Sequence, residues 1–336
     1  MGAMTQPLEA EDHAGIFVPH AFEEQRADLG EVRMNYATAG KPDQPALLLI
    51  PGQTESWWGY EQAMPLLAEH FQVYAVDLRG QGRSTWTPGR YTLDNMGNDL
   101  VRFLDLVIGR PAIVSGLSSG GVLSAWLSAY ARPGQVRGAV YEDPPLFSSE
   151  LIPSCGPSIR QSIGPVFALR NKWLGDQWSI GDWDGMQAAA AAELPASIAA
   201  ALKAMGATTG AARPPDLSQP PQNLKEYDPE WGRAFYSGTV AASCDHARML
   251  ASVRVPVLFT HHFRAVDGET GRLMGAISDL QAGRVREIIA AAGQPVKYVS
   301  FPKMAHSMHG QDPALFTRTV AEWSVTLSPE NSSGSA

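Results

Sequence analysis

The sequence predicts an α/β fold in which a mostly parallel sheet is flanked by helices and carries an inserted helical segment. Short apolar runs alternate with stretches of helical periodicity, which implies crossover connections between parallel strands. Residues 46–50 are apolar throughout, as expected for a strand that is covered on both faces. Between residues 147 and 240 strand-forming runs are scarce, and the alternation resumes after them.

The predicted elements follow one another in a regular order, beginning at residue 32. Strands are predicted at residues 32–37, 46–50, 72–76, 111–115, 136–141, 255–260 and 296–301. Helices are predicted at residues 60–70, 93–108, 122–130, 278–292 and 313–327, with two Ala-rich helices, 186–194 and 197–205, in the insertion. We assign residues 14–146 and 241–329 to the α/β core and 147–240 to a helical cap, and expect 1–13 and 330–336 to be disordered.

The composition narrows the function classes. The chain has 336 residues, 44% of them hydrophobic and 18% charged, which suits a large globular core with one insertion. Its formal net charge of −8 disfavours nucleic acid and anionic membrane surfaces as partners. Cys155 and Cys244 lie far apart without a Cys/His cluster, so we expect free thiols. The lack of an apolar leader or long apolar stretch then predicts a cytoplasmic protein.

One short pattern, Gly116 to Gly120, points to chemistry. Its sequence, Gly-Leu-Ser-Ser-Gly, matches G-x-S-x-G and lies between a predicted strand and a predicted helix, as in a nucleophile elbow. Glycines two residues before and after Ser118 allow close packing that a Cβ would prevent. An ordinary Gly/Ser turn that caps a helix would show the same letters, but the flanking elements favour a nucleophilic serine.

A serine nucleophile needs a base, usually a histidine that a carboxylate orients. His306 lies after the last predicted strand and before the last helix, at the same edge of the sheet as Ser118. We therefore predict that His306 is the base. His309, one helical turn further along, is expected to face solvent or the cap instead.

The carboxylate partner has three candidates, since it should lie between the serine and the histidine in the chain. Asp143 ends the strand after the elbow helix, and the two prolines that follow it fix the chain as it leaves the sheet. Asp267 follows the next strand in a loop that looks longer and more mobile, and Glu142 is adjacent to Asp143. We prefer Asp143 and keep Asp267 and Glu142 as alternatives.

An ester-cleaving site also needs donors for the oxyanion of the tetrahedral intermediate. The backbone N–H of Ser119, the residue after the nucleophile, is one candidate. The backbone N–H of Gln53, which follows Pro51 and Gly52 after an earlier strand, is the other.

Over nearly its whole length the chain resembles the α/β-hydrolase superfamily, in which residues 77–84 match the D-x-R-G-x-G-x-S turn. Within the superfamily it is most similar to the bacterial zearalenone lactonases. Pro51 stands where most α/β-hydrolases have His, a departure that the group shares and that leaves the backbone donor available. The stretches that carry the similarity are residues 56–58, 79–88, 118–121, 125–130, 176–183, 223–235 and 260–262.

This resemblance implies a serine hydrolase that opens the macrocyclic ester of a resorcylic acid lactone. In the fungal zearalenone hydrolases the triad acid comes from the strand after the elbow helix. Matching that pattern to this sequence places the acid on Asp143, although the fungal enzymes have Glu at this position. Their substrate-contacting cap tryptophan matches Trp183. A large, flat substrate suits an apolar cleft, and five aromatic residues are candidates to line it: Trp183, Trp178, Trp57, Trp58 and Phe235. Trp126 and Trp323 are expected in the core instead.

Other functions remain open at this stage. The same scaffold could be a general carboxylesterase, a carbon–carbon bond hydrolase, or a ligand receptor with slow or single-turnover cleavage. Dehalogenase and epoxide hydrolase chemistry is disfavoured, because those enzymes have Asp where Ser118 stands. Adjacent His261 and His262 would diverge in a strand, so no metal site is expected. We predict no cofactor, a small-molecule lactone as the partner, and leave open whether the chain forms a homodimer.

Overall fold

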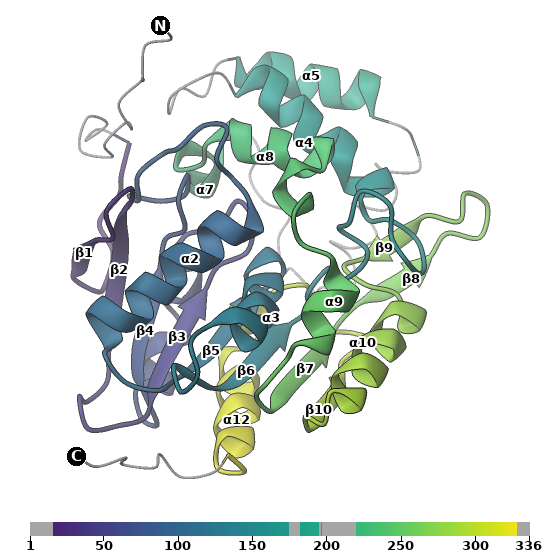
Figure 1. Ribbon diagram of the computed structural model, residues 1–336. Helices are drawn as coiled ribbons and strands as arrows, with labels where there is room; N and C mark the ends of the chain where they lie inside the picture. The colour runs from purple at the N-terminus through teal and green to yellow at the C-terminus, as the bar shows by residue number, and fades with distance from the viewer. Residues whose placement is uncertain (1–15, 175–181, 195, 197–219, 328–336) are drawn as a thin grey trace, which may run out of the picture.

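The computed structural model describes residues 16–174, 182–194, 196 and 220–327 (Figure 1). In this part of the chain eight strands form one sheet in the order β1-β2-β4-β3-β5-β6-β7-β10. β1 and β2 pair antiparallel, as do β2 and β4, and every other pair in this sheet is parallel. The strands are β1 Glu24–Asp28, β2 Arg33–Ala39, β3 Ala46–Ile50, β4 Gln72–Val76, β5 Ala112–Leu117, β6 Val136–Glu142, β7 Val257–His261 and β10 Val296–Ser300.

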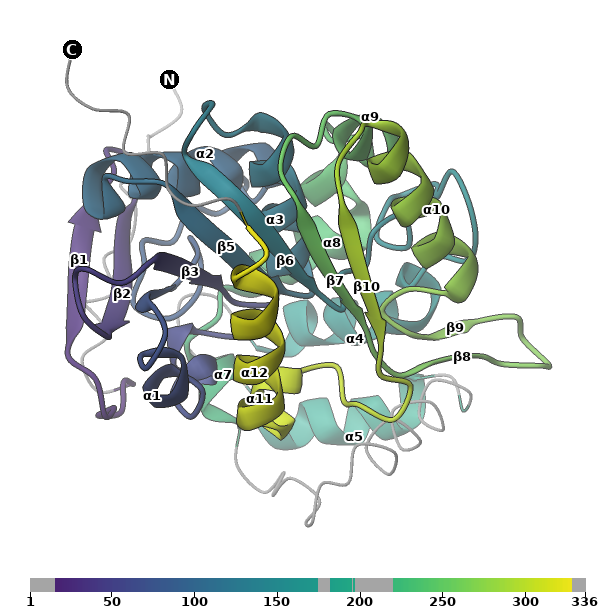
Figure 2. The same ribbon diagram turned by 90° about the horizontal axis from the view of Figure 1, so that it is seen from below.

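Helices cover both faces of this sheet, as the apolar run of β3 predicts. Successive side chains of β3 enter opposite cores: Leu48 belongs to the apolar cluster that includes residues of α2, α3, α9 and α10, whereas Leu49 belongs to the cluster that includes residues of α1 and α12. Figure 2 shows α1, α11 and α12 on one face and α2, α3, α9 and α10 on the other. The bounds are α1 Met64–Leu67, α2 Leu93–Phe103, α3 Ser119–Tyr130, α9 His246–Ala251, α10 Asp279–Ala291, α11 Met308–Gln311 and α12 Pro313–Ser324.

Between β6 and β7 the described residues form helices and irregular segments, as predicted for the insertion. We call α4 (Arg160–Trp173), α5 (Trp183–Glu193), α7 (Gln222–Lys225) and α8 (Pro229–Ser237) the inserted helices. In Figure 1 α4, α5 and α8 lie above the sheet. The entry to α8 is held by the core, since Gly82 N–H donates to the Glu226 carbonyl and Asp228 N–H to the Gly80 carbonyl, both at 2.8–2.9 Å. The predicted helix 197–205 and the predicted disordered ends 1–13 and 330–336 lie outside the described residues.

Three predictions about the elements are wrong in detail. β1 forms where no element was expected, because an edge strand pairs on one side only and needs no apolar run. Residues 263–268, expected as a loop, contribute to an antiparallel hairpin of β8 (Arg264–Val266) and β9 (Leu273–Gly275). The helix expected over 60–70 is limited to α1.

Other expectations about the core are confirmed. Trp126 and Trp323 are buried, and the indole N–H of Trp126 donates to Asp94 at 2.9 Å. Cys155 and Cys244 are free thiols. Among the helices that the structure describes, none combines the length and the apolar character that crossing a membrane would require.

Candidate active site

Ser118 occupies a strained turn between β5 and α3. Its φ of 56° and ψ of −119° lie outside the favoured regions for a residue with a side chain. The turn closes because its glycines lack a Cβ: one on Gly116 would lie 2.0 Å from the Gly120 carbonyl oxygen, and one on Gly120 would lie 2.3 Å from the Ile50 oxygen. The geometry is that of a nucleophile elbow, as the G-x-S-x-G pattern predicts.

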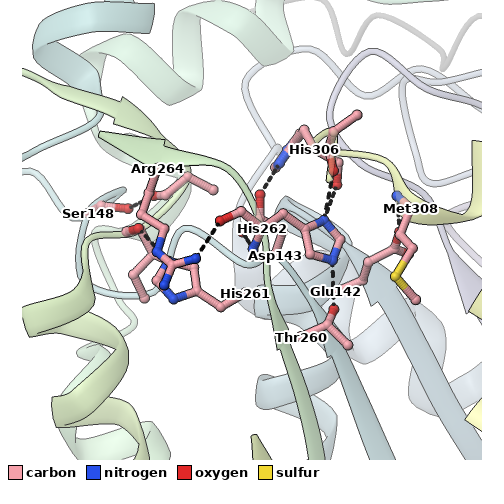
Figure 3. Close-up of polar contacts among 12 residues, drawn as sticks. Glu142, Asp143, Ser148, Thr260, His261, His262, Arg264, His306 and Met308 are labelled. Atoms are coloured by element: carbon pink, nitrogen blue, oxygen red, sulfur yellow. Dashed lines mark hydrogen bonds and ion pairs between the residues drawn. The ribbon is translucent and has the colours of Figure 1, made fainter. Parts of the chain in front are cut away.

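Asp143 and His306 meet at the end of β6. The Nδ1 atom of His306 lies 2.7 Å from Asp143 Oδ2, and the carboxylate is 1% exposed (Figure 3). Burial favours the neutral acid, but His262 and the bond from His306 outweigh it and hold the pKa of Asp143 below its usual value. Burial likewise opposes charging of His306, yet the bond to Asp143 and its charge raise the pKa of His306. The pair is therefore arranged to stabilise an imidazolium.

His262 holds this pair in place through hydrogen bonds to Asp143 and to the loop that carries His306. This role was not predicted from the sequence. Its backbone N–H donates to Asp143 Oδ1 at 3.0 Å, so both oxygens of Asp143 are engaged. Its Nδ1 lies 2.9 Å from the Ala305 carbonyl oxygen and 3.0 Å from that of His306. Because carbonyl oxygens only accept, Nδ1 carries a proton, and Nε2 lies 3.0 Å from the Thr260 hydroxyl (Figure 3). His262 thus joins the strand that precedes it to the loop that carries the base.

The signal for this role is the position of His262 directly after β7, at the strand end that faces the loop of His306. His261 binds elsewhere, to the Tyr298 hydroxyl at 2.9 Å and the Ile277 carbonyl at 2.8 Å. The two imidazoles therefore diverge, as the alternation of side chains along a strand predicts.

The alternative carboxylates have other partners. Glu142 pairs with His309, whose Nδ1 lies 2.8 Å from Glu142 Oε2, and also accepts the backbone N–H of Met308 at 2.7 Å. The prediction that His309 faces solvent or the cap is wrong, because this bond and the ring of Tyr60, at 3.9 Å between centroids, keep it buried. Asp267 lies in the turn between β8 and β9, where it accepts hydrogen bonds from the backbone and side chain of Thr270.

The turn that carries Gln53 is braced from the core and from the inserted helices. Glu55 N–H donates to the Gly52 carbonyl, and Thr54 has a φ of 66°. The Gln81 amide donates to the same Gly52 carbonyl at 3.0 Å, and the Asn223 amide donates to the Thr54 carbonyl at 2.7 Å.

The Gln53 side chain completes this bracing. Its amide donates to the Tyr227 hydroxyl at 2.8 Å. On the other side of Ser118, Ser119 is the first residue of α3, so its backbone N–H has no partner within the helix. Both residues line the same cavity as Ser118.

A cavity of about 260 Å³ brings these groups together. Ser118 and His306 lie on its wall, from segments far apart in the sequence, and the inserted helices supply apolar side chains. Two ionisable groups, Glu55 and Arg170, also line it, and burial raises the pKa of Glu55. Its lining residues are Gln53, Thr54, Glu55, Ser118, Ser119, Pro145, Ile159, Ser162, Ile163, Phe167, Arg170, Phe235, Leu273, Met274, Gly275, Ala276 and His306.

Of the aromatic residues predicted for this cavity, the structure places one on its wall and three elsewhere. Phe235 lines the cavity. Trp57 is buried in the core, with its indole N–H on Glu24 at 2.8 Å, and Trp58 stacks on His20 with its indole N–H on Glu226. Trp183 packs against the apolar cluster between α4 and α5. The fifth candidate, Trp178, lies outside the described residues.

Comparisons with known proteins agree with this fold. A family described as "alpha/beta hydrolase fold" matches residues 45–159, which include the elbow and Asp143. Over 102 residues the chain is 33% identical to 3-oxoadipate enol-lactonase 2 of Acinetobacter baylyi, covering 30% of this chain and 38% of that protein. Over 139 residues it is 33% identical to bifunctional epoxide hydrolase 2 of Sus scrofa, covering 40% of this chain and 24% of that one. The matches thus span well under half of these relatives.

Solved structures extend the likeness in fold to most of the chain. The enol-lactonase from Burkholderia xenovorans LB400 aligns with a TM-score of 0.62 and 18% identity, covering 90% of this chain and 100% of that one. A hydrolase from Pseudomonas aeruginosa PA01 aligns with a TM-score of 0.59 and 21% identity, covering 90% and 99%. The chain has the α/β-hydrolase fold, and its residues 45–159 match the family of that description.

Proposed function

We propose that this chain, which has the α/β-hydrolase fold, is a cofactor-free serine hydrolase that opens the macrocyclic ester of a resorcylic acid lactone such as zearalenone. The observation that carries the proposal is the 2.7 Å bond between Asp143 and His306 beside a cavity that Ser118 also lines. A strained serine and a histidine at one cavity, with a buried carboxylate bonded to the histidine, are the parts of an acyl-transfer site.

In the first step Ser118 Oγ attacks the ester carbonyl carbon, and the carbonyl electron pair moves onto its oxygen. His306 Nε2 accepts the serine proton, while Asp143 holds Nδ1 and stabilises the imidazolium. The backbone N–H groups of Gln53 and Ser119 donate to the oxyanion. When the intermediate collapses, the bond to the ring oxygen breaks and His306 delivers the proton to that oxygen.

In the second step water releases the opened chain. The leaving hydroxyl of a lactone remains tethered to the acyl group, so the acyl-enzyme carries the whole substrate. His306 takes a proton from water, the resulting hydroxide adds to the acyl carbon, and collapse of the second intermediate returns the proton to Ser118. The product is a hydroxy acid heavier than the substrate by one water.

Two observations support a lactone as the substrate. The cavity is largely apolar, with Ile159, Ile163 and Phe235 among its lining residues, which suits a bulky substrate with few polar groups. Among the similar proteins, one curated relative and one solved structure are named as enol-lactonases. The resemblance of the sequence to the zearalenone lactonases then narrows the lactone class.

The test is incubation of the protein with zearalenone, followed by chromatography with mass detection. The wild type should form the hydrated product over many turnovers, and Ser118→Ala should lose about 10³-fold or more in rate. Ser124→Ala is the matched control, because Ser124 is buried on α3, the helix that follows Ser118, and does not line the cavity.

Other outcomes separate the rival functions. Turnover of simple aryl esters without turnover of the lactone would indicate a general carboxylesterase, and cleavage of a carbon–carbon bond would indicate the corresponding hydrolase. A single turnover that ends in a stable adduct would indicate a receptor. Undiminished turnover by Ser118→Ala would overturn the mechanism itself.

A further inference from the structure

The cavity contains one cation that the proposed chemistry does not use. Arg170 lies on α4 and lines the cavity together with Ser118 and His306. Its guanidinium carbon lies 5.6 Å from the centre of the Phe167 ring. Phe167 in turn packs against Phe235, with 5.1 Å between the ring centroids. Arg170 therefore lies at the aromatic part of the cavity wall.

Two other arginines, one buried and one half-buried, have acceptors within the chain. Arg79 forms two bonds to Asp99, at 2.7 and 2.8 Å, and one to Glu31 at 3.1 Å. Arg160 donates to the carbonyl oxygens of Phe235 and Tyr236. For Arg170, by contrast, no ion pair is formed with any carboxylate in the described ranges.

The surroundings of Arg170 do not neutralise it. Burial lowers the pKa of Arg170, and only the neighbouring Tyr227 opposes this shift. Glu55, the carboxyl group that lines the same cavity, instead interacts with His309 and His306. A guanidinium in apolar surroundings is costly unless an anion or a strong acceptor meets it. Because Arg170 lines the cavity, a ligand bound there is the natural source of that acceptor.

We propose that Arg170 is a specificity-determining residue that binds an acidic hydroxyl of the substrate, carried by an aromatic ring that packs on Phe167 and Phe235. This inference rests on the proposed function and names its substrate class: aryl esters with a free phenolic hydroxyl. The planar guanidinium suits a phenol or phenolate oxygen, since it offers several donors and full charge. The ester carbonyl of the same molecule then lies toward Ser118.

The test compares two ligands that differ only at their phenolic oxygens, methyl 2,4-dihydroxybenzoate and methyl 2,4-dimethoxybenzoate. Their binding is measured by calorimetry on Ser118→Ala and on the double variant with Arg170→Gln, so that neither ligand is consumed. A hydrogen bond to a charged group corresponds to on the order of tenfold in affinity or more. Arg170→Gln should weaken the dihydroxy ester by at least that factor and change the dimethoxy ester by about twofold or less.

Two further variants keep the result interpretable. Arg233→Gln, on exposed α8 surface where Arg233 pairs with Glu230, should leave both affinities unchanged. Arg170→Lys keeps the charge and should retain part of the preference for the dihydroxy ester. This result would show that the cavity remains folded and that the preference depends on the cation. Equal weakening of both esters by Arg170→Gln, no weakening of either, or no binding of either by Ser118→Ala would overturn the proposal. Because no turnover is measured, failure of the lactonase proposal remains a separate outcome, decided by the zearalenone assay.

Discussion

Glu142 and His309 form a buried pair directly beside the Asp143–His306 pair, with 2.8 Å between Glu142 Oε2 and His309 Nδ1. Neither side chain is more than 1% exposed. Two adjacent carboxylates thus engage two histidines three residues apart, one pair at the cavity and one inside the core. We infer that the Asp143–His306 pair serves catalysis and that the Glu142–His309 pair serves stability.

His309→Phe tests the structural half of this division. Phenylalanine can keep the stacking on Tyr60 but leaves Glu142 as an unpaired buried carboxylate, so the free energy of unfolding should fall by about 3 kcal/mol. The pKa of His309 is raised in the folded chain: burial opposes this, and Glu142 overcomes it. The contribution of His309 to the free energy of unfolding is therefore complete below its pKa in the unfolded chain, about 6.5. This contribution is lost as the pH rises through the pKa of His309 in the folded chain.

Urea unfolding at several pH values measures both effects. The difference between wild type and His309→Phe should be largest in mildly acidic solution and should narrow as the pH rises. Exposed His70→Phe is the control and should change stability by no more than about 0.5 kcal/mol. Equal stabilities of wild type and His309→Phe would contradict the assigned role.

Asp143→Asn tests the catalytic half. Asparagine tolerates the positive φ of 42° at this position and can still accept the His262 N–H, so the fold should be retained. The asparagine side chain presents either its NH2 group, a donor, or its oxygen, a weaker acceptor than a carboxylate, to His306 Nδ1. The imidazole then loses the tautomer with the proton on Nδ1, which catalysis needs. We expect kcat to fall by about 10³- to 10⁴-fold with an unchanged melting temperature. The same substitution at Asp267 should leave kcat unchanged, and a large loss there would reopen the choice of acid.

Much of this arrangement could be predicted because chain order limits it. The apolar run of β3 and the G-x-S-x-G pattern are local features, and a parallel sheet brings the ends of its strands to one edge. His306 follows from that rule. The choice between Glu142 and Asp143 does not follow from chain order. The side chains of adjacent residues diverge at a strand end, and the path of the loop after β10 decides which histidine each carboxylate contacts.

The aromatic wall of the cavity was harder to predict for a related reason. Trp57 and Trp58 lie close in sequence to Gln53, but a tight helical turn over residues 57–60 directs Trp57 into the core and Trp58 toward His20. An aromatic side chain packs equally well in a core or in a cavity, so composition does not distinguish the two. Phe167 and Arg170 lie on a helix that no pattern in the insertion predicted.

The raised pKa of His306 predicts the acid limb of the activity profile. His306 must be neutral to accept the serine proton, so kcat/KM should fall as the pH falls through its pKa. Burial alone would lower that pKa, and the bond to Asp143 raises it above the usual value of about 6.5. The midpoint of the limb should therefore lie above this value in the wild type and move to lower pH in Asp143→Asn. Circular dichroism over the same range separates titration from unfolding, and a limb that does not move would contradict the pairing.

His262 offers a last prediction, because it contacts Asp143 and His306 and is not among the residues that line the cavity. His262→Phe keeps the backbone N–H on Asp143 but removes the donor that holds the carbonyl oxygens of Ala305 and His306. A base displaced by a fraction of an ångström lowers kcat by roughly ten- to a hundredfold, while KM should change little. His262→Asn places an amide N–H near the position of Nδ1 and should recover part of the loss. A merely space-filling role for His262 would give the opposite order, with Phe more active than Asn, since Phe fills the buried site better.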